Sequence, residues 1–359
     1  MVIDPHRDVD RPEPAQATPS EVPWLPRVAP GLLLTSAVAA AATVLGRLVP
    51  VVGGPVFAIV LGLLAATVVP GLRADRWAPG AAVASKSVLQ LSIVVLGTGL
   101  SLGQVFRVGG QSLPVLLGTL AVALGGAWLF GRWLGVRGAT QILIGVGTGI
   151  CGASAIAATT AVIRARQAEV AYAISTIFTF NIAAVLLFPP IGRLLGLSPH
   201  SFGLWAGTAI NDTSSVVAAA YPYGGGAGSY GIVVKLTRTL MLIPIVIVLA
   251  IRTAGKQGSA SRSRFSLRGL PWRRLVPAFL VGFVVAAALD SVGAIPAGWH
   301  PALATLGTFL ITTALAGIGL ALRPGDLRRA GHRPLLLGGL LWIAVAATSL
   351  GLQAVTGTL

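Results

Sequence analysis

The chain has 359 residues and a formal net charge of +16, yet only 10% of its residues are charged and 55% are hydrophobic. Soluble domains carry about 25% charged residues, so this composition excludes a soluble globular domain and indicates an all-α polytopic membrane protein. The positive charge does not indicate nucleic-acid binding, because most basic residues lie in short connections between apolar runs, where membrane topology places them. The single cysteine excludes an internal disulfide.

The first 30 residues differ in composition from the rest. They contain five of the ten acidic residues and seven prolines, and they lack the apolar core of a signal peptide. We therefore expect a disordered tail over 1–30, followed by a single transmembrane domain over 31–359.

Eleven apolar segments follow the tail, each close to the roughly 20 residues that a spanning helix needs. They cover 31–49, 52–70, 87–105, 112–134, 141–163, 171–195, 202–221, 229–251, 273–294, 301–322 and 334–357. The pattern predicts ten or eleven transmembrane helices.

Basic residues orient these segments. The connections 252–274 and 323–333 are rich in arginine and should be cytoplasmic. Counting back places 71–86, 135–140 and the N-terminus on the same side. Arg164 and Arg166 then fall outside, against the rule, unless 141–163 is a re-entrant segment and not a span.

Two internal repeats are present. At an offset of 220, GTGLSL (97–102) matches GIGLAL (317–322), and PVLLG (114–118) matches PLLLG (334–338). These copies lie an odd number of segments apart, which predicts an inverted-topology repeat of the kind found in secondary transporters. At an offset of 60, GTGICGASAIAA (147–158) matches GTAINDTSSVVA (207–218). If both segments span, the second pair runs parallel and does not fit an inverted repeat.

The stretch GVGTGICGASAIAATT (145–160) has four glycines in eight residues. Each glycine costs about 1 kcal/mol inside a helix, so the cluster predicts a broken helix. Unwound backbone at membrane depth lines a cavity or is buried in protein, and its free N–H and C=O groups can bind ions. Close helix packing through small residues is the structural alternative. The candidate site residues here are Thr148, Gly149, Cys151, Gly152 and Ser154, with Cys151 better explained as a packing residue than as a reactive thiol.

The stretch GTAINDTSS (207–215) places Asp212 inside an apolar run, where a carboxylate costs several kcal/mol unless it is paired, hydrated or protonated. It adds Asn211, Thr213 and Ser214 to the candidate site. The alternative is a segment end that dips into water.

Lys235 and Arg238 lie three residues apart and so share one helix face. They either extend to the membrane surface or face the core, where they could pair with Asp212 or attract an anion. Asn181 is an isolated polar residue in the segment 171–195 and either lines the site or bonds a neighbouring helix.

The blocks GTGICGASAIAA, AGTAINDTSSVVAAAY, KLTR and GTGLSL resemble the YeiH-like family of bacterial inner-membrane proteins, whose members are labelled sulfate exporters. The resemblance covers roughly 31–357. It implies ten or eleven helices, distant kinship with cation/proton antiporters and bile-acid symporters, and transport of sulfate or a related anion. The family pattern commonly has His before the Asp and Gln after Thr-Ser, where this chain has Asn211 and Ser215.

The leading hypothesis is a secondary transporter of a small anion in the bacterial inner membrane, coupled to a proton or sodium gradient. The first alternative is a cation/proton antiporter that uses Asp212. A remote alternative is an intramembrane aspartyl protease that uses Asp212 and Asp290; otherwise we expect no enzyme activity. We expect no cofactor, metal or nucleic acid, and a homo-oligomer is compatible with the sequence.

Overall fold

The computed structural model describes residues 24–48, 54–69, 71, 76–256, 276–321 and 332–359, and every regular element in these ranges is helical. The helices are α1 (Trp24–Leu48), α2 (Gly54–Val68), α3 (Ala78–Val83), η2 (Ala84–Val88), α4 (Leu89–Gly97), α5 (Leu102–Trp133), α6 (Ala139–Gly149), α7 (Ala153–Ile163), α8 (Gln167–Leu194), α9 (Pro199–Ala209), α10 (Thr213–Ala220), α11 (Ala227–Leu240), α12 (Leu242–Lys256), α14 (Ala278–Ser291), η4 (Ala297–Trp299), α15 (His300–Ala321) and α16 (His332–Thr356).

Seven of the described helical stretches are long and apolar enough to cross a membrane. The shorter helices α2, α7 and α14 are also apolar. The fold is therefore the all-α polytopic membrane protein that the composition predicts.

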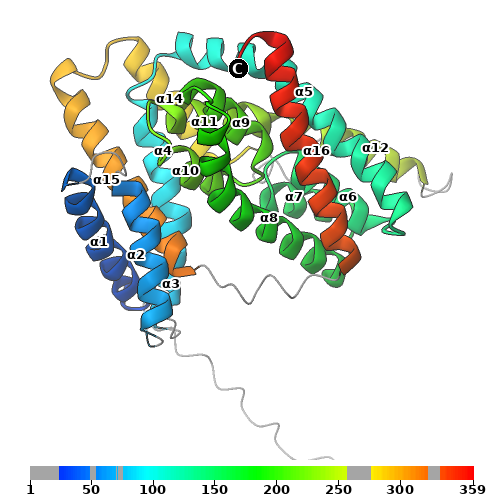
Figure 1. Ribbon diagram of the computed structural model, residues 1–359, viewed down its shortest axis with the longest axis horizontal. Helices are drawn as coiled ribbons and strands as arrows, with labels where there is room; N and C mark the ends of the chain where they lie inside the picture. Colours follow the sequence, from blue (N-terminus) through cyan, green and yellow to red (C-terminus); the bar gives the residue numbers. More distant parts are fainter. Residues whose placement is uncertain (1–23, 49–53, 70, 72–75, 257–275, 322–331) are drawn as a thin grey trace, which may run out of the picture.

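The helices form two bundles, which are separated from left to right in Figure 1. The flank bundle contains α1, α2, the continuous stretch α3–η2–α4, α14 and α15. The hairpin bundle contains α5 to α12 and α16. The two bundles meet through α10 against α2 and through α14 against α5, and an apolar core that includes Ile59, Ile93, Val217 and Ile311 fills the space between them.

Helices α6 and α7 form a re-entrant hairpin and not a span. Gly147 of α6 packs against Ile156 of α7, so the chain folds back on itself. Val136 before α6 and Ile163 at the end of α7 pack into the same apolar cluster. Both ends of the hairpin therefore lie at one end of the bundle, and the expectation of a span over 141–163 is corrected in favour of its re-entrant alternative.

Helices α9 and α10 form a second re-entrant hairpin. The hydroxyl of Tyr223, just after α10, donates to the carbonyl of Leu197, just before α9, at 2.6 Å. Arg193 likewise donates to the carbonyl of Pro222, at 3.4 Å. The two ends of this hairpin lie together, so the expected span over 202–221 is also re-entrant.

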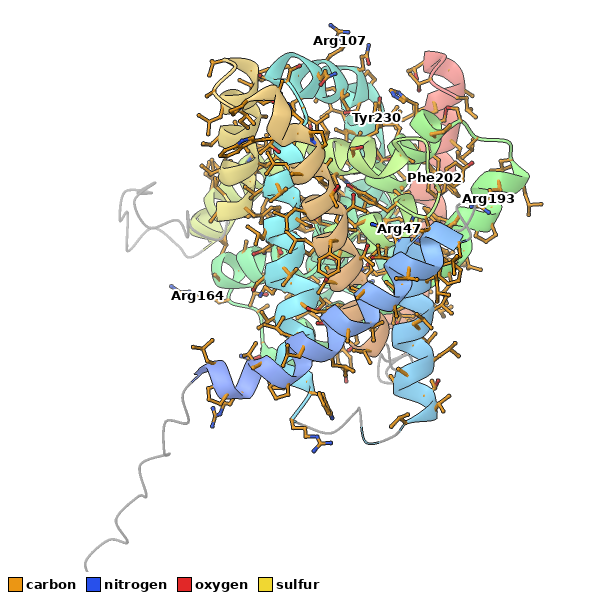
Figure 2. The ribbon with its side chains drawn as sticks, turned by 90° about the vertical axis from the view of Figure 1, so that its left-hand side faces the viewer. Arg47, Arg107, Arg164, Arg193, Phe202 and Tyr230 are labelled. Atoms are coloured by element: carbon orange, nitrogen blue, oxygen red, sulfur yellow. The ribbon has the colours of Figure 1, made fainter. Side chains whose placement is uncertain are left out.

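The two hairpins enter the bundle from opposite ends. Figure 2 shows Arg107, Phe202 and Tyr230 in the upper half of the molecule, and Arg164, which ends α7, in the lower half. Phe202 lies in the first turns of α9. The two copies of the offset-60 pair therefore run in opposite directions (Figure 2). They were expected to run parallel if both were spans, and neither is a span.

Other boundaries differ from the predicted ones. Helix α1 begins at Trp24, inside the stretch 1–30 that was expected to be disordered, and residues 1–23 lie outside the described residues. The span expected over 87–105 runs from Ala78 to Gly97 instead, which places Lys86 in a π-helical turn within the span. Most of the expected basic connections 252–274 and 323–333 also lies outside the described residues.

Candidate functional site

Each hairpin has a break of three residues at its tip. Helix α6 ends at Gly149, and the chain turns through Ile150 to Gly152, whose φ of +66° is a left-handed conformation that favours glycine. Helix α9 ends at Ala209, and α10 resumes after Asp212. The glycine cluster and the polar cluster thus mark the two breaks, as the sequence predicts.

The two tips touch each other midway along α8. A Cβ atom placed on Gly152 would lie 3.5 Å from the Cβ atom of Asp212 and 3.4 Å from the side chain of Ile177. The backbone N–H of Asp212 donates to Asn181 Oδ1 over 3.4 Å. Asn181 is buried near the middle of α8, so it lies at the second tip and also bonds the N-cap residue of the neighbouring helix α10.

Lys235 of α11 joins the two tips. Its side chain is fully buried, and its ammonium group donates to the carbonyl of Ile150 at 2.8 Å and to that of Ile210 at 2.7 Å. Helix α11 reaches this position because Gly203 and Gly207 on α9 leave room for its backbone. The ammonium group is therefore bonded to both breaks at once.

Arg238 lies one turn further along α11, and it too is fully buried. Its Nε donates to the carbonyl of Gly149 at 2.6 Å and its Nη2 to that of Thr148 at 2.8 Å, while Nη1 donates to the carbonyl of Thr208. Thr148 and Thr208 are equivalent in the offset-60 repeat, as are the residues that bind Lys235. Each cation therefore contacts matching carbonyls of both copies.

The two cations do not form an ion pair with Asp212, because the ion pairs between described residues include neither Lys235 nor Arg238. The carbonyls that they bind are the last ones of α6 and α9, which have no partner within the helix and form the negative end of the helix dipole. These carbonyls therefore stabilise the two cations locally, without an ion pair.

Asp212 is the N-cap of α10. Its Oδ2 accepts from the N–H groups of Ser214 at 3.0 Å and Ser215 at 3.4 Å, and from the Ser214 hydroxyl. The carboxylate is partly exposed, as are Thr213 and Ser214. Its Oδ1 accepts no hydrogen bond from the described part of the chain, which leaves it available to a proton, a cation or a donor on a substrate.

The start of α7 has no such cap. Gly152 occupies the position equivalent to Asp212 and has no side chain with which to cap the helix. The N–H groups of Ala153 and Ser154 have no acceptor among the described residues, and the side chain of Ser154 is exposed. This end of α7 carries the positive side of a helix dipole, which favours a negative group.

The remaining candidates divide into two groups. Cys151 is buried in an apolar cluster with Val146 and Ile150, so it is a packing residue here. Asn211 Oδ1 and Thr148 Oγ1 are buried and have no partner among the described residues.

Sequence reasoning missed the contribution of Ile150, Thr208 and Ile210, because they act through backbone carbonyls and not through their side chains. The offset-60 repeat was the signal that could have found them. In this repeat Ile150 is equivalent to Ile210, and Thr148 is equivalent to Thr208.

The site as a whole carries more positive than negative charge. Two buried cations face one carboxylate, and the opposing dipole ends of the four half-helices largely cancel at the tips. In a low-dielectric interior this imbalance favours an anion beside the uncapped start of α7. Chemically, the arrangement leaves one carboxylate oxygen of Asp212 and the first N–H groups of α7 open to a ligand.

The chain matches the family model described as conserved hypothetical protein 698 over residues 30–338. It is 43% identical over 336 residues to a UPF0324 membrane protein of Streptococcus pyogenes serotype M3, covering 92% of this chain and 98% of the relative. It is 40% identical over 335 residues to one from Streptococcus mutans, covering 91% and 97%. No solved structure matches it. The chain thus belongs to the family of conserved hypothetical protein 698, as a relative of the UPF0324 membrane proteins.

Proposed function

We propose that the protein is a secondary transporter of a small anion. The observation that carries this proposal is the meeting of two oppositely directed re-entrant hairpins at mid-depth, on a site with one excess positive charge. Interrupted helices that meet near the bilayer midplane are the usual place where transporters bind substrates and ions. Sulfate or a related sulfur oxyanion is the substrate class that the family resemblance suggests.

The two-bundle architecture supports alternating access. Both tips, Asp212 and the two cations belong to the hairpin bundle, while the flank bundle contributes an apolar surface that faces it. A rigid shift of one bundle against the other would then expose the tips first to one side and then to the other. The bonds from Lys235 and Arg238 keep the two tips together during such a shift.

The basic residues support an orientation. In the re-entrant topology Arg137, Arg164, Arg166 and Arg333 all fall at the same end of the hairpin bundle. The positive-inside rule then makes this the cytoplasmic end. The N-terminus is cytoplasmic in this arrangement and the C-terminus is external, and no basic pair is left on the wrong side.

Purified protein in liposomes tests the proposal. Uptake of labelled sulfate, sulfite and small sulfonates should exceed that of protein-free liposomes and should respond to an imposed pH gradient. Asp212→Asn provides the matched inactive control, because asparagine caps helices about as well as aspartate while it removes the charge. Equal uptake by wild type, Asp212→Asn and empty liposomes would reject transport of these anions.

A cation/proton antiporter is the second candidate, and the free Oδ1 of a partly exposed Asp212 favours it. Sodium-driven proton movement in the same liposomes, without any anion requirement, would select this function over the first. The proposal assigns no catalysis to the protein. Asp290, the second acid of an aspartyl protease pair, binds His300 Nε2 at 2.6 Å at the far end of α14.

A further inference from the structure

The hairpin tips present a set of backbone carbonyls that resembles a binding site for an inorganic cation. Five carbonyl oxygens converge there, from Thr148, Gly149, Ile150, Thr208 and Ile210. Unwound carbonyls and half-helix C-termini are the groups with which transporters of this type coordinate sodium. In this chain all five oxygens accept hydrogen bonds from side chains of α11.

We propose that the ammonium group of Lys235 is a tethered cation that occupies the place of a coupling ion between the tips. It contacts one carbonyl of each hairpin, Ile150 and Ile210, at 2.8 and 2.7 Å, and it is completely buried. A free sodium ion there would bind both tips and would leave at the end of each cycle. The ammonium group binds both tips permanently, because it is covalently attached to α11.

The tethered cation has a consequence for the coupling ion, and this consequence rests on the proposed transport function. With the carbonyls of both tips occupied by a fixed charge, the tips have no vacancy for sodium. Transport should therefore proceed equally well in sodium and in choline salts, and any coupling should involve the proton at Asp212. Lys235 acts in this scheme as a positioning residue, since it touches the tips and not the substrate.

Chemical rescue tests the tethered cation without measuring transport. Lys235→Ala removes the cation and leaves a space shaped like its stem. The unfolding temperature of the purified variant should fall by roughly 5–10 °C, because two buried carbonyls lose their donor. Addition of n-propylammonium chloride should recover a large part of this loss, while choline chloride at equal concentration should not. An unchanged unfolding temperature, or equal effects of the two salts, would overturn the proposal.

Two further variants distinguish loss of the buried cation from a general loss of folding. Lys235→Met fills the stem but carries no charge, so it should be destabilised without responding to propylammonium. Lys86→Ala is the matched control, because Lys86 lies in a span but is exposed and donates to no carbonyl of the described residues. It should neither lose stability nor respond to the amine. For the wild type, identical unfolding temperatures in sodium and choline chloride are expected, and a specific gain in sodium would contradict the proposal even if no alanine variant can be purified.

Discussion

The two hairpins are built alike at one end of their breaks and differently at the other. Before the break, both present equivalent carbonyls, Ile150 with Ile210 and Thr148 with Thr208, to the same two cations. After the break, the first hairpin has Gly152 and an uncapped helix, whereas the second has Asp212 and a capped one. The symmetric half of the site holds the tips together, and the asymmetric half carries the groups that are free to bind.

This division assigns different consequences to mutations on the two sides of the break. Changes to the cations should damage the fold, because they strand buried carbonyls of both hairpins. Changes to the residues after the break should damage function while the fold persists. Four sets of variants test whether loss of stability and loss of function separate in this way.

Arg238→Gln should have the largest effect on stability. It removes the donors of three buried carbonyls, from Thr148, Gly149 and Thr208, and a loss of about 3 kcal/mol or more is expected. The stability of Arg238→Lys should lie between those of the wild type and Arg238→Gln, because a lysine keeps the charge but cannot reproduce the planar fork of the guanidinium group. Unfolding in detergent measures both, with Arg107→Gln as an exposed control. A fully stable Arg238→Gln would show that the symmetric half does not hold the tips.

Asp212→Asn should abolish transport and cost little stability. The amide oxygen can still accept from Ser214 and Ser215, so the cap survives without its charge. Asp212→Ala should lose transport and about 1 kcal/mol in addition, because the cap is gone. Uptake in liposomes and thermal unfolding separate the two variants, and wild-type uptake by Asp212→Asn would remove the carboxylate from the mechanism.

Gly152→Ala should lose roughly 1–2 kcal/mol, because its positive φ is unfavourable for alanine. Gly196→Ala is the matched control: its φ is +65° and nothing lies within 4 Å of the added methyl group. Both variants place a methyl group at a positive φ and should lose stability, yet only Gly152→Ala should slow transport, since its methyl group lies beside Asp212 and the start of α7. Equal transport by the two variants would indicate that the uncapped tip is only structural.

Tyr223→Phe should have the smallest effect. It removes the bond to the Leu197 carbonyl that joins the two ends of the second hairpin, and a loss of about 0.5–1.5 kcal/mol is expected. Because the tips lie far from this bond, the uptake rate should stay at the wild-type level. A large fall in uptake would mean that the hairpin ends move during transport.

The sequence was sufficient to predict the fold class and the position of both breaks. Four glycines around Gly149 and the polar run around Asp212 are local signals, and each interrupts a helix for a local reason. These features depend on neighbouring residues alone, which is why a single sequence reveals them.

The direction of the hairpins could not be read in the same way. A segment of about 20 apolar residues has the same length and hydropathy whether it spans or turns back, and only Arg164 and Arg166 indicated the difference. The partners of Lys235 were also hidden. Its acceptors are backbone carbonyls, which become available only where a helix ends. Residue types alone therefore suggested the carboxylate of Asp212 as its partner.

The meeting of the tips midway along α8 has an electrical consequence. A group at mid-depth in a membrane experiences about half of the transmembrane voltage, which corresponds to roughly 1 kcal/mol per elementary charge for each 100 mV. Loading a proton onto Asp212 from either face would therefore be driven or opposed by the membrane potential as well as by the pH difference. In the proposed transporter, the depth of Asp212 would make the rate of proton loading depend on the membrane potential.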